Sequence, residues 1–514
     1  MLEPIQKQGR QWRRSLKALT ATVAIAALAA CSSQAPPDDA APAHDNTLTM
    51  ALGYGGTGVV FDPHAFSDGF NTHWGVMFYE QLGYLNDEGA YENQLAESFT
   101  PNEDGTVWTA VLKDGVTFHS GKALTADDVL FTYERIMNPD NGATGFGNTT
   151  NIAEVKKIDD LTVEFDLLEP SGIFPEQLVS GFNNGIIPTD FDLEAPVSTG
   201  PWELVGPPTG ESIEMKRYEG YHGEPTKLDS IRLLGIPDDD ARLNALQTGQ
   251  VDAVLPVRGA QMSTVEQLDG TEILSLPTSA FDIVTMRVDE GPLADQRVRQ
   301  AIRMAVNREE IVTVVDGGQA RIGHDLYGID DPLYRDDLVR ERDVEGAKQL
   351  IEEAGAVGMK LTLVSLNTTE GIAQIVAKNA NEIGLDVEVE VKDEVSFYTD
   401  GYLEYDFGFD QWPGVSILGA AALIDAPGAN LNYTHFDDPE YQELYTTAVQ
   451  TLDDDVRADA VGQMQEILFD RGGLLLPRFR NTVAAVPSNT TGWPEVDPWS
   501  FGDVLALKNV EFTS

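Results

Sequence analysis

Residues 360–391 read KLTLVSLNTTEGIAQIVAKNANEIGLDVEVEV and carry the clearest folding signal in the chain. The segment 360–366 has the apolar content of a strand, and 386–391 alternates acidic and apolar residues as a half-exposed strand does. Between them, apolar residues recur at helical spacing over 372–383, and Gly384 ends that helix. Strand, helix and strand with short joints predict a parallel strand pair with a right-handed crossover. The fold class is therefore α/β.

The same alternation of elements extends through the rest of the chain. Residues 108–113, 160–168 and 231–236 read as strands. A capping box at 125–128 opens a helix that ends before Asn138-Pro139, and a second amphipathic helix covers 298–306. The 514 residues are too many for one hydrophobic core, because single cores stop growing near roughly 250–300 residues. At least two lobes are expected.

The charge of the chain limits its partners. The formal net charge is −50, from 84 acidic against 34 basic residues. Such a field repels nucleic acid and anionic lipid and keeps a protein soluble. We therefore expect a solvated acidic surface and no nucleic-acid partner.

The first 30 residues have the pattern of a secretory signal peptide. Basic residues precede an apolar run from Ala18 to Ala30, which is shorter than the roughly 20 residues that span a bilayer. Cys31, the only cysteine, follows Leu28-Ala29-Ala30 as in a bacterial lipobox, and the alternative is a buried structural cysteine. We expect a lipidated Cys31 at the start of a flexible tether over 31–46, which is rich in Pro, Ala and Asp.

Enzyme signatures are missing from the sequence. It contains no H-E-x-x-H, G-x-S-x-G or P-loop motif, and acidic residues are too numerous for one pair to stand out. His64 and His73, with Asp62 and Asp68, form a conceivable metal group in a loop, and lining of a loop or cleft is the alternative. We predict no catalytic residue, no metal and no cofactor, with a lipid-anchored surface hydrolase as the competing hypothesis.

Several longer motifs occur in a fixed order along the chain. They are WTAVLKDGVTFHSGKALTADDV (108–129), STGPW (198–202), DDDARLNALQTGQVDAV (238–254), LADQRVRQAIRMAVNREEI (293–311), NLNYTHFDDPEYQEL (430–444) and LPRF (476–479). Together they resemble the family 5 extracellular solute-binding proteins of bacterial ABC importers, the group with oligopeptide-, dipeptide- and nickel-chelate-binding members.

This resemblance implies a two-lobed, periplasmic-binding-protein-like α/β fold with an extra inserted domain and a hinge between the lobes. The implied domains are domain I (47–82, 189–285 and 476–514), inserted domain II (83–188) and domain III (286–475). The chain would cross between the lobes near 283–290 and 474–482, and two crossing strands suit hinge bending around a ligand.

The resemblance also implies a function. The protein would be a monomer, lipid-anchored on the extracytoplasmic face of the cell membrane, that captures a solute and delivers it to ABC permease subunits with cytoplasmic ATPases. Peptide is the leading ligand, and sugar, opine and metal chelate are alternatives. A binding protein with a sensor or chaperone role is a further alternative.

Residues 407–416, FGFDQWPGVS, resemble the segment that enters the family's ligand site. Trp412 matches an aromatic residue that borders the ligand, and its alternative role is core packing. Gln411 and Asp410 are candidates beside it. The remaining candidates lie outside this segment: Asn432, Tyr433, Phe61 and Asp62.

The sequence departs from the peptide-binding members at one position. These members place an aspartate shortly after the tryptophan, where it pairs with the peptide's α-ammonium group. Here the corresponding position is Val415, or a neighbour among Gly414 and Ser416, and none of them carries charge. Asp410 or Asp425 would have to replace it, because burying an unpaired ammonium costs several kcal/mol. Arg299 and Arg303, on a predicted helix, are expected to bind carboxylates within their lobe.

Overall fold

The structure is a computed structural model of the chain. This structure describes residues 46–53, 58–86, 89–180, 183–207, 210, 212–496 and 504–513. The predicted signal peptide, Cys31 and nearly all of the predicted tether lie outside the described residues. Within the described part, no helix combines the length and the apolar character needed to cross a membrane.

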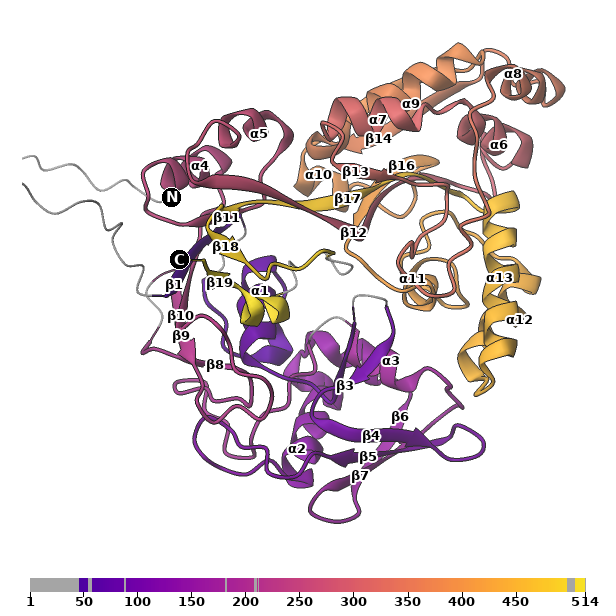
Figure 1. The fold of residues 1–514 in the computed structure, drawn as a ribbon. Coiled ribbons are helices and arrows are strands. Elements are labelled where there is room, and N and C mark those ends of the chain that lie inside the picture. Colours follow the sequence, from indigo (N-terminus) through magenta and orange to yellow (C-terminus); the bar gives the residue numbers. More distant parts are fainter. Residues whose placement is uncertain are drawn as a thin grey trace, which may run out of the picture. The chain divides into compact units, whose positions relative to one another are not determined.

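A nine-stranded mixed sheet is the largest element of the fold (Figure 1). Its order is β16 (Phe407–Trp412), β12 (Thr271–Met286), β17 (Leu474–Pro487), β11 (Ala253–Leu255), β1 (Thr47–Leu52), β10 (Ser230–Gly235), β9 (Ser212–Arg217) and β8 (Trp202–Leu204), and β13 (Ala320–Ile322) pairs with β17. β1 is parallel to β10 and β11, and the other pairs are antiparallel.

The long strands β12 and β17 connect the two ends of this sheet. β17 pairs with β11 through Ala485, whereas β12 pairs with β16 only from Phe281 onward. The ladder between β12 and β17 shifts register between Pro277 and Phe281 and again between Asp282 and Val284. The expected crossings near 283–290 and 474–482 overlap the end of β12 and the first part of β17, and their positions stay predictions.

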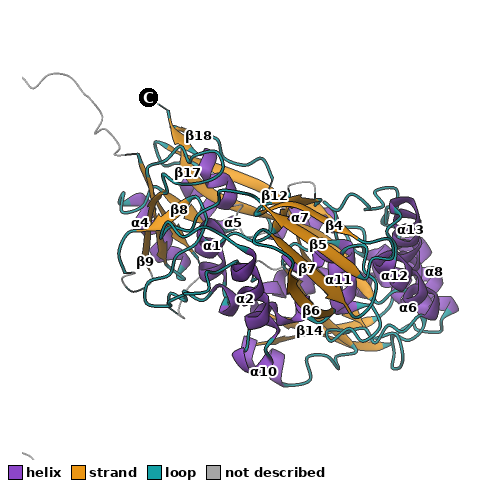
Figure 2. Ribbon diagram, turned by 90° about the horizontal axis from the view of Figure 1, so that it is seen from below, coloured by secondary structure: helices purple, strands orange, loops and turns teal. Residues whose placement is uncertain are grey.

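A separate four-stranded antiparallel sheet has the order β4 (Ala96–Pro101), β5 (Val107–Leu112), β7 (Thr162–Leu167) and β6 (Ile152–Lys157). The helix α2 (Ala126–Met137) begins at Thr125 with the predicted capping box, in which Asp128 accepts the Thr125 backbone N–H at 3.0 Å. α3 (Phe174–Val179) packs against this region, and Figure 2 shows β4, β5, β7 and β6 next to one another. The strands expected at 108–113 and 160–168 are confirmed within one or two residues at each end.

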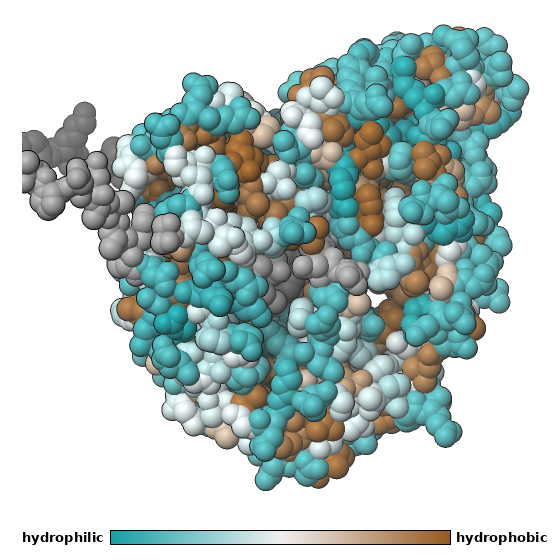
Figure 3. Space-filling model, in the orientation of Figure 1, coloured by the Kyte–Doolittle hydropathy of each residue, from teal (hydrophilic) through white to brown (hydrophobic). Residues whose placement is uncertain are grey.

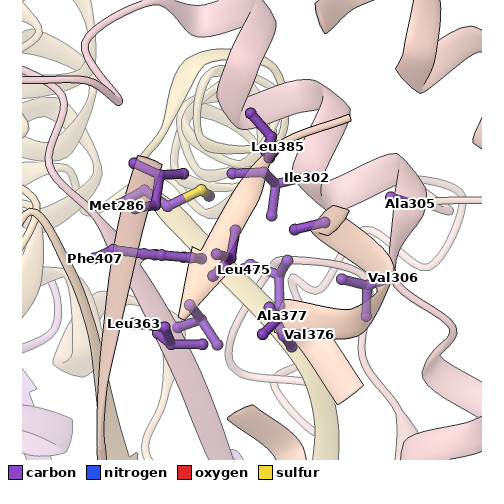
Figure 4. Close-up of a cluster of buried hydrophobic side chains, with 14 of the residues drawn as sticks. Met286, Ile302, Ala305, Val306, Leu363, Val376, Ala377, Leu385, Phe407 and Leu475 are labelled. Atoms are coloured by element: carbon purple, nitrogen blue, oxygen red, sulfur yellow. The ribbon is translucent and has the colours of Figure 1, made fainter. Parts of the chain in front are cut away.

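The predicted strand–helix–strand unit is present. β14 (Lys360–Leu366) and β15 (Asp386–Lys392) pair in parallel, and α9 (Glu370–Glu382) connects them. Their apolar faces pack with α6 (Gln296–Ala305), α7 (Arg308–Val315) and α8 (Val344–Glu353). Figure 4 shows the resulting core, where Leu363, Val376 and Phe407 lie together with Ile302 and Leu475.

The remaining elements cover these sheets. The helices are α1 (Gly69–Phe78), α4 (Asp239–Gln247), α5 (Gly259–Val265), α10 (Glu394–Thr399), α11 (Ile417–Ile424), α12 (Pro439–Gln450) and α13 (Asp454–Arg471). The short strands are β2 (Gly83–Leu85), β3 (Tyr91–Asn93), β18 (Thr490–Thr491) and β19 (Glu511–Phe512), and the 3₁₀ turns are Pro63–Ala65, Pro139–Asn141, Thr144–Thr149, Asn367–Thr369 and Val504–Asn509. Hydrophilic residues cover most of the face seen in Figure 3. The boundaries of domains I, II and III stay predictions.

The expectation for two arginines is corrected. Arg299 donates to the backbone carbonyls of Leu293 and Arg471, each at 2.8 Å, and Arg303 donates to Phe469 O at 3.1 Å. These partners are carbonyls and not carboxylates. Arg471 and Phe469 belong to the last turn of α13, whose carbonyls have no partner within the helix, so the guanidinium groups satisfy them.

Candidate functional site

A cavity of about 660 Å³ lies beside the crossing strands β12 and β17. Segments far apart in the sequence form its wall: the residues after β11, the end of α7, the end of β16 and the middle of β17. Its lining comprises residues 69, 255–259, 262, 278, 280, 315, 316, 319, 368, 411–413, 478 and 480–483.

An ionic centre joins three strands at this wall. The antiparallel registers pair Asp282 of β12 with Arg478 of β17 and with Gln411 of β16. The Asp282 carboxylate is fully buried, lies 2.6 Å from the Arg478 guanidinium and also pairs with Arg480. Gln411 Nε2 donates to Asp282 Oδ1 at 3.0 Å. Burial by itself would raise the pKa of Asp282, but Arg480 and Arg478 outweigh it and hold this pKa below its usual value.

A second carboxylate borders the cavity at the end of α7. Asp316 is the C-cap residue of this helix, and its Oδ1 accepts a hydrogen bond from Arg478. Burial raises the pKa of Asp316 to about 6, although Arg478 opposes the shift. Asp316 therefore titrates close to neutral pH, and the other charged residues of the cavity lining are arginines.

Arginine donors supply the positive charge of the wall. Arg480 donates to the Trp412 carbonyl at 2.7 Å, and 28% of its side chain remains exposed. Arg258 is more exposed and lies 3.1 Å from Asp239. Guanidinium groups of this kind suit carboxylates, because their planar donors match the two oxygens.

Two of the predicted site residues, Gln411 and Trp412, line the cavity. The Trp412 ring is stacked on Phe281, with centroids 6.1 Å apart and planes 3° apart, and only 6% of the residue is exposed. Thr368 donates to Gln411 Oε1 at 3.2 Å. Trp412 thus packs in a core and also lines the cavity, and its contact with a ligand stays a prediction.

The other predicted site residues do not line this cavity. Asp410 accepts a hydrogen bond from the Tyr402 hydroxyl at 2.6 Å, and the Tyr433 hydroxyl lies 3.0 Å from that of Tyr402. Asn432 closes a turn through two hydrogen bonds with the Phe436 backbone, at 2.9 and 3.0 Å.

Phe61 and Asp62 lie elsewhere in the fold. Phe61 packs edge-on against Trp74 with centroids 5.8 Å apart. Asp62 caps a 3₁₀ turn and pairs with Arg135 of α2.

The conceivable metal group does not assemble. His64 Nε2 bonds to Gly185 O at 2.9 Å and His73 Nδ1 to Gly69 O at 2.5 Å. Burial lowers the pKa of each imidazole to about 4. Over the described ranges, no cluster of three or more His, Cys, Asp or Glu side chains is placed to bind a metal ion.

Four residues of the ionic centre were missed by the sequence reasoning: Asp282, Asp316, Arg478 and Arg480. A signal was available for the arginines, because Arg478 and Arg480 alternate within the apolar stretch of β17 in a strongly acidic chain. No comparable signal marks Asp282 or Asp316 among 84 acidic residues.

Comparison with known proteins decides the family. A family model described as "Bacterial extracellular solute-binding proteins, family 5 Middle" matches residues 90–423. This chain belongs to that family. Glutathione-binding protein GsiB of Shigella flexneri serotype 5b (strain 8401) is 28% identical over 361 residues, which cover 67% of this chain and 70% of GsiB.

Solved structures of the family share the fold. The ABC transporter substrate-binding protein CtaP of Listeria monocytogenes superposes with a TM-score of 0.80 at 24% identity, covering 91% of this chain and 99% of CtaP. The periplasmic binding protein DppA of Helicobacter pylori, solved with the peptide STSA, gives a TM-score of 0.74 at 22% identity, covering 91% and 98%. The predicted family and α/β fold class are therefore confirmed.

Family 5 proteins bind solutes and catalyse no reaction. This chain is accordingly an extracytoplasmic solute-binding component of an ABC importer and not an enzyme, which excludes the surface hydrolase.

Proposed function

We propose that this family 5 protein is held at the membrane by a lipid on Cys31, captures a short peptide in the cavity beside β12 and β17, and delivers it to an ABC permease. The observation that carries the proposal is the cavity itself, with Gln411 and Trp412 in its wall next to Arg478 and Arg480. No covalent bond changes. The solute stabilises the arrangement that binds it by its differential affinity for that arrangement.

The size and charge of the cavity support a small anionic or zwitterionic solute. Its volume of about 660 Å³ falls within the roughly 300–1,000 Å³ of small-molecule sites. Arg480 and Arg258 offer donors for a carboxylate, such as the C-terminus of a peptide. Glutathione, which GsiB binds, and the peptide STSA, which is bound in the DppA structure, belong to this class of solute. Opine, metal chelate and sugar remain the competing ligands, and sugar is the least suited to a wall with several full charges.

The peptide-binding members bind the ammonium group of the peptide through an aspartate that this chain lacks, and two acids, Asp410 and Asp425, were candidates to replace it. Val415 packs against the hydrophobic cluster that contains Phe281 and Trp412. Asp425 is fully buried and accepts a hydrogen bond from Tyr327 at 2.9 Å, and Asp410 is bonded to Tyr402. Neither Asp410 nor Asp425 lines the cavity.

A thermal-shift panel tests the ligand class. The purified protein is mixed with glutathione, the tetrapeptide Ser-Thr-Ser-Ala, an opine, nickel–histidine and a disaccharide. We expect a peptide to raise the melting temperature in a concentration-dependent way, because a ligand that binds the folded state stabilises it by mass action. A shift only with the opine, the chelate or the sugar would contradict the peptide assignment and leave the importer role intact.

A further inference from the structure

Asp316 has one carboxylate oxygen with no hydrogen-bond partner within the described part of the chain. Its Oδ1 accepts from Arg478, but Oδ2 is buried and has no hydrogen-bond partner among the residues that the structure describes. Asn481 of β17, which lines the same cavity, has a buried side-chain oxygen in the same condition, while its Nδ2 donates to Ser275 at 3.0 Å. Buried acceptors without a donor are costly, so two of them in one cavity wall indicate a ligand that brings donors.

The charges around Asp316 favour a positively charged donor. The groups that face it are Arg478, Asp282 and Arg480. The two arginines are balanced by Asp282 and Asp316, so the centre has no net charge to repel a cation. Arg478 is shared between Asp282 and Asp316, and Arg480 pairs with Asp282 alone. Asp316 is thus the less well-compensated carboxylate of the two, and it lines the cavity, whereas Asp282 does not.

We infer that Asp316 binds a protonated amino group of the solute. This inference rests on the proposed function and makes it more specific: the solute carries both a carboxylate, for the arginines, and a cationic nitrogen. Residues 413–416 contain no acid, and Asp410 and Asp425 lie outside the cavity lining, so Asp316 is the carboxylate in position for this role. Burial raises the pKa of Asp316 and so disfavours its ionised form in the empty protein. A cationic group of the solute would stabilise that ionised form.

The experiment compares a free and a blocked amine. Isothermal titration of the full chain with glutathione and with N-acetylglutathione is performed on the wild type, on Asp316→Asn and on the matched control Asp425→Asn, a buried acid outside the cavity. We expect Asp316→Asn to bind glutathione about tenfold to hundredfold more weakly, because it loses a charge-assisted hydrogen bond to the amino group. The affinity for N-acetylglutathione should change by less than about twofold, and Asp425→Asn should leave both affinities unchanged.

The pH dependence gives an independent readout. Wild-type affinity for the free amine should fall as the pH drops below about 6, since protonated Asp316 no longer attracts a cation, and Asp316→Asn should lose this dependence. The fold should survive the substitution, because Arg478 keeps Asp282 as a partner. We expect a melting temperature of the empty variant at or above that of the wild type.

Two results would overturn the inference. The first is an equal loss of affinity for the free and the blocked amine in Asp316→Asn. The second concerns a wild type that binds neither compound, in which case mass spectrometry identifies the solute that co-purifies. A solute without a cationic nitrogen would then refute the role of Asp316, while the importer function stands. A co-purified cationic solute that is depleted in Asp316→Asn supports it. A failure of the proposed function is distinct, since the protein would then carry no solute at all.

Discussion

Trp412 shows at the scale of one residue why a candidate ligand contact can also be a core residue. It is 6% exposed, is stacked on Phe281 and accepts a hydrogen bond from Arg480 through its carbonyl. We predict that Trp412→Ala destabilises the empty protein by about 3–5 kcal/mol, as truncation of a buried aromatic does. Trp412→Phe keeps a ring and should lower the free energy of unfolding far less. Denaturant unfolding with and without glutathione separates the two effects, and an unchanged stability of Trp412→Ala would remove Trp412 from the core.

Asp425 gives a second prediction at this scale. Burial raises its pKa to about 7, and the hydrogen bond from Tyr327 offsets only part of the shift. Between about pH 4 and pH 7 the folded protein therefore holds a proton that the unfolded chain has released, so the free energy of unfolding falls as the pH rises through this window. We expect Asp425→Asn to stabilise the protein at pH 8, on the order of 1–3 kcal/mol, and to have little effect at pH 4.5.

The control for Asp425 is Asp269→Asn, which changes an exposed acid. Its unfolding free energy should follow that of the wild type at both pH values. Equal responses of the two variants at pH 8 would show that the effect comes from net charge and not from a buried carboxylate.

At the scale of elements, a tight backbone contact joins the segment before α3 to the last turn of α12 and the residue that follows it. Gly172 N donates to Val449 O at 2.7 Å, and Arg457 donates to Gly172 O at 3.1 Å. A Cβ on Gly172 would lie 1.7 Å from Thr451 O, which is far inside van der Waals contact. We predict that Gly172→Ala forces these segments apart, destabilises by about 1–3 kcal/mol and weakens solute binding although it lies outside the cavity lining.

Gly147→Ala is the matched control for this contact, because its added Cβ meets no atom within 4 Å. Calorimetric titration of the two variants with the same solute makes the comparison. Identical affinities for both would mean that the contact at Gly172 does not influence the cavity.

The elements also show what a single sequence can predict. The capping box at Thr125, the alternation of β5 and the strand–helix–strand unit around α9 are local patterns, and each formed where it was expected. The Asp282–Arg480 pair joins residues 198 positions apart, so its formation depends on the register of β12 against β17. Periodicity does not encode such a register. The α13 carbonyls that Arg299 and Arg303 bind were missed for the same reason, since Arg471 and Phe469 are 172 and 166 positions away from them in the chain.

At the scale of the whole molecule, the proposed lipid anchor gives a prediction that is independent of the cavity. A Cys31→Ser protein lacks the thiol that would be acylated, so it should stay in the aqueous phase on detergent partitioning and appear in the medium or as uncleaved precursor. The wild type should partition into detergent. Membrane fractionation of Cys31→Ser identical to that of the wild type would show that Cys31 carries no anchor.

The central claim is that the cavity beside β12 and β17 holds a small solute destined for an importer. Native mass spectrometry of the protein purified without denaturation from the cells that encode it tests this claim most directly. We predict a noncovalent adduct of peptide size that contains both a carboxylate and an amine, that disappears on unfolding and that is depleted in Asp316→Asn. A protein that carries no adduct, and whose melting temperature no member of the solute panel raises, would contradict the account.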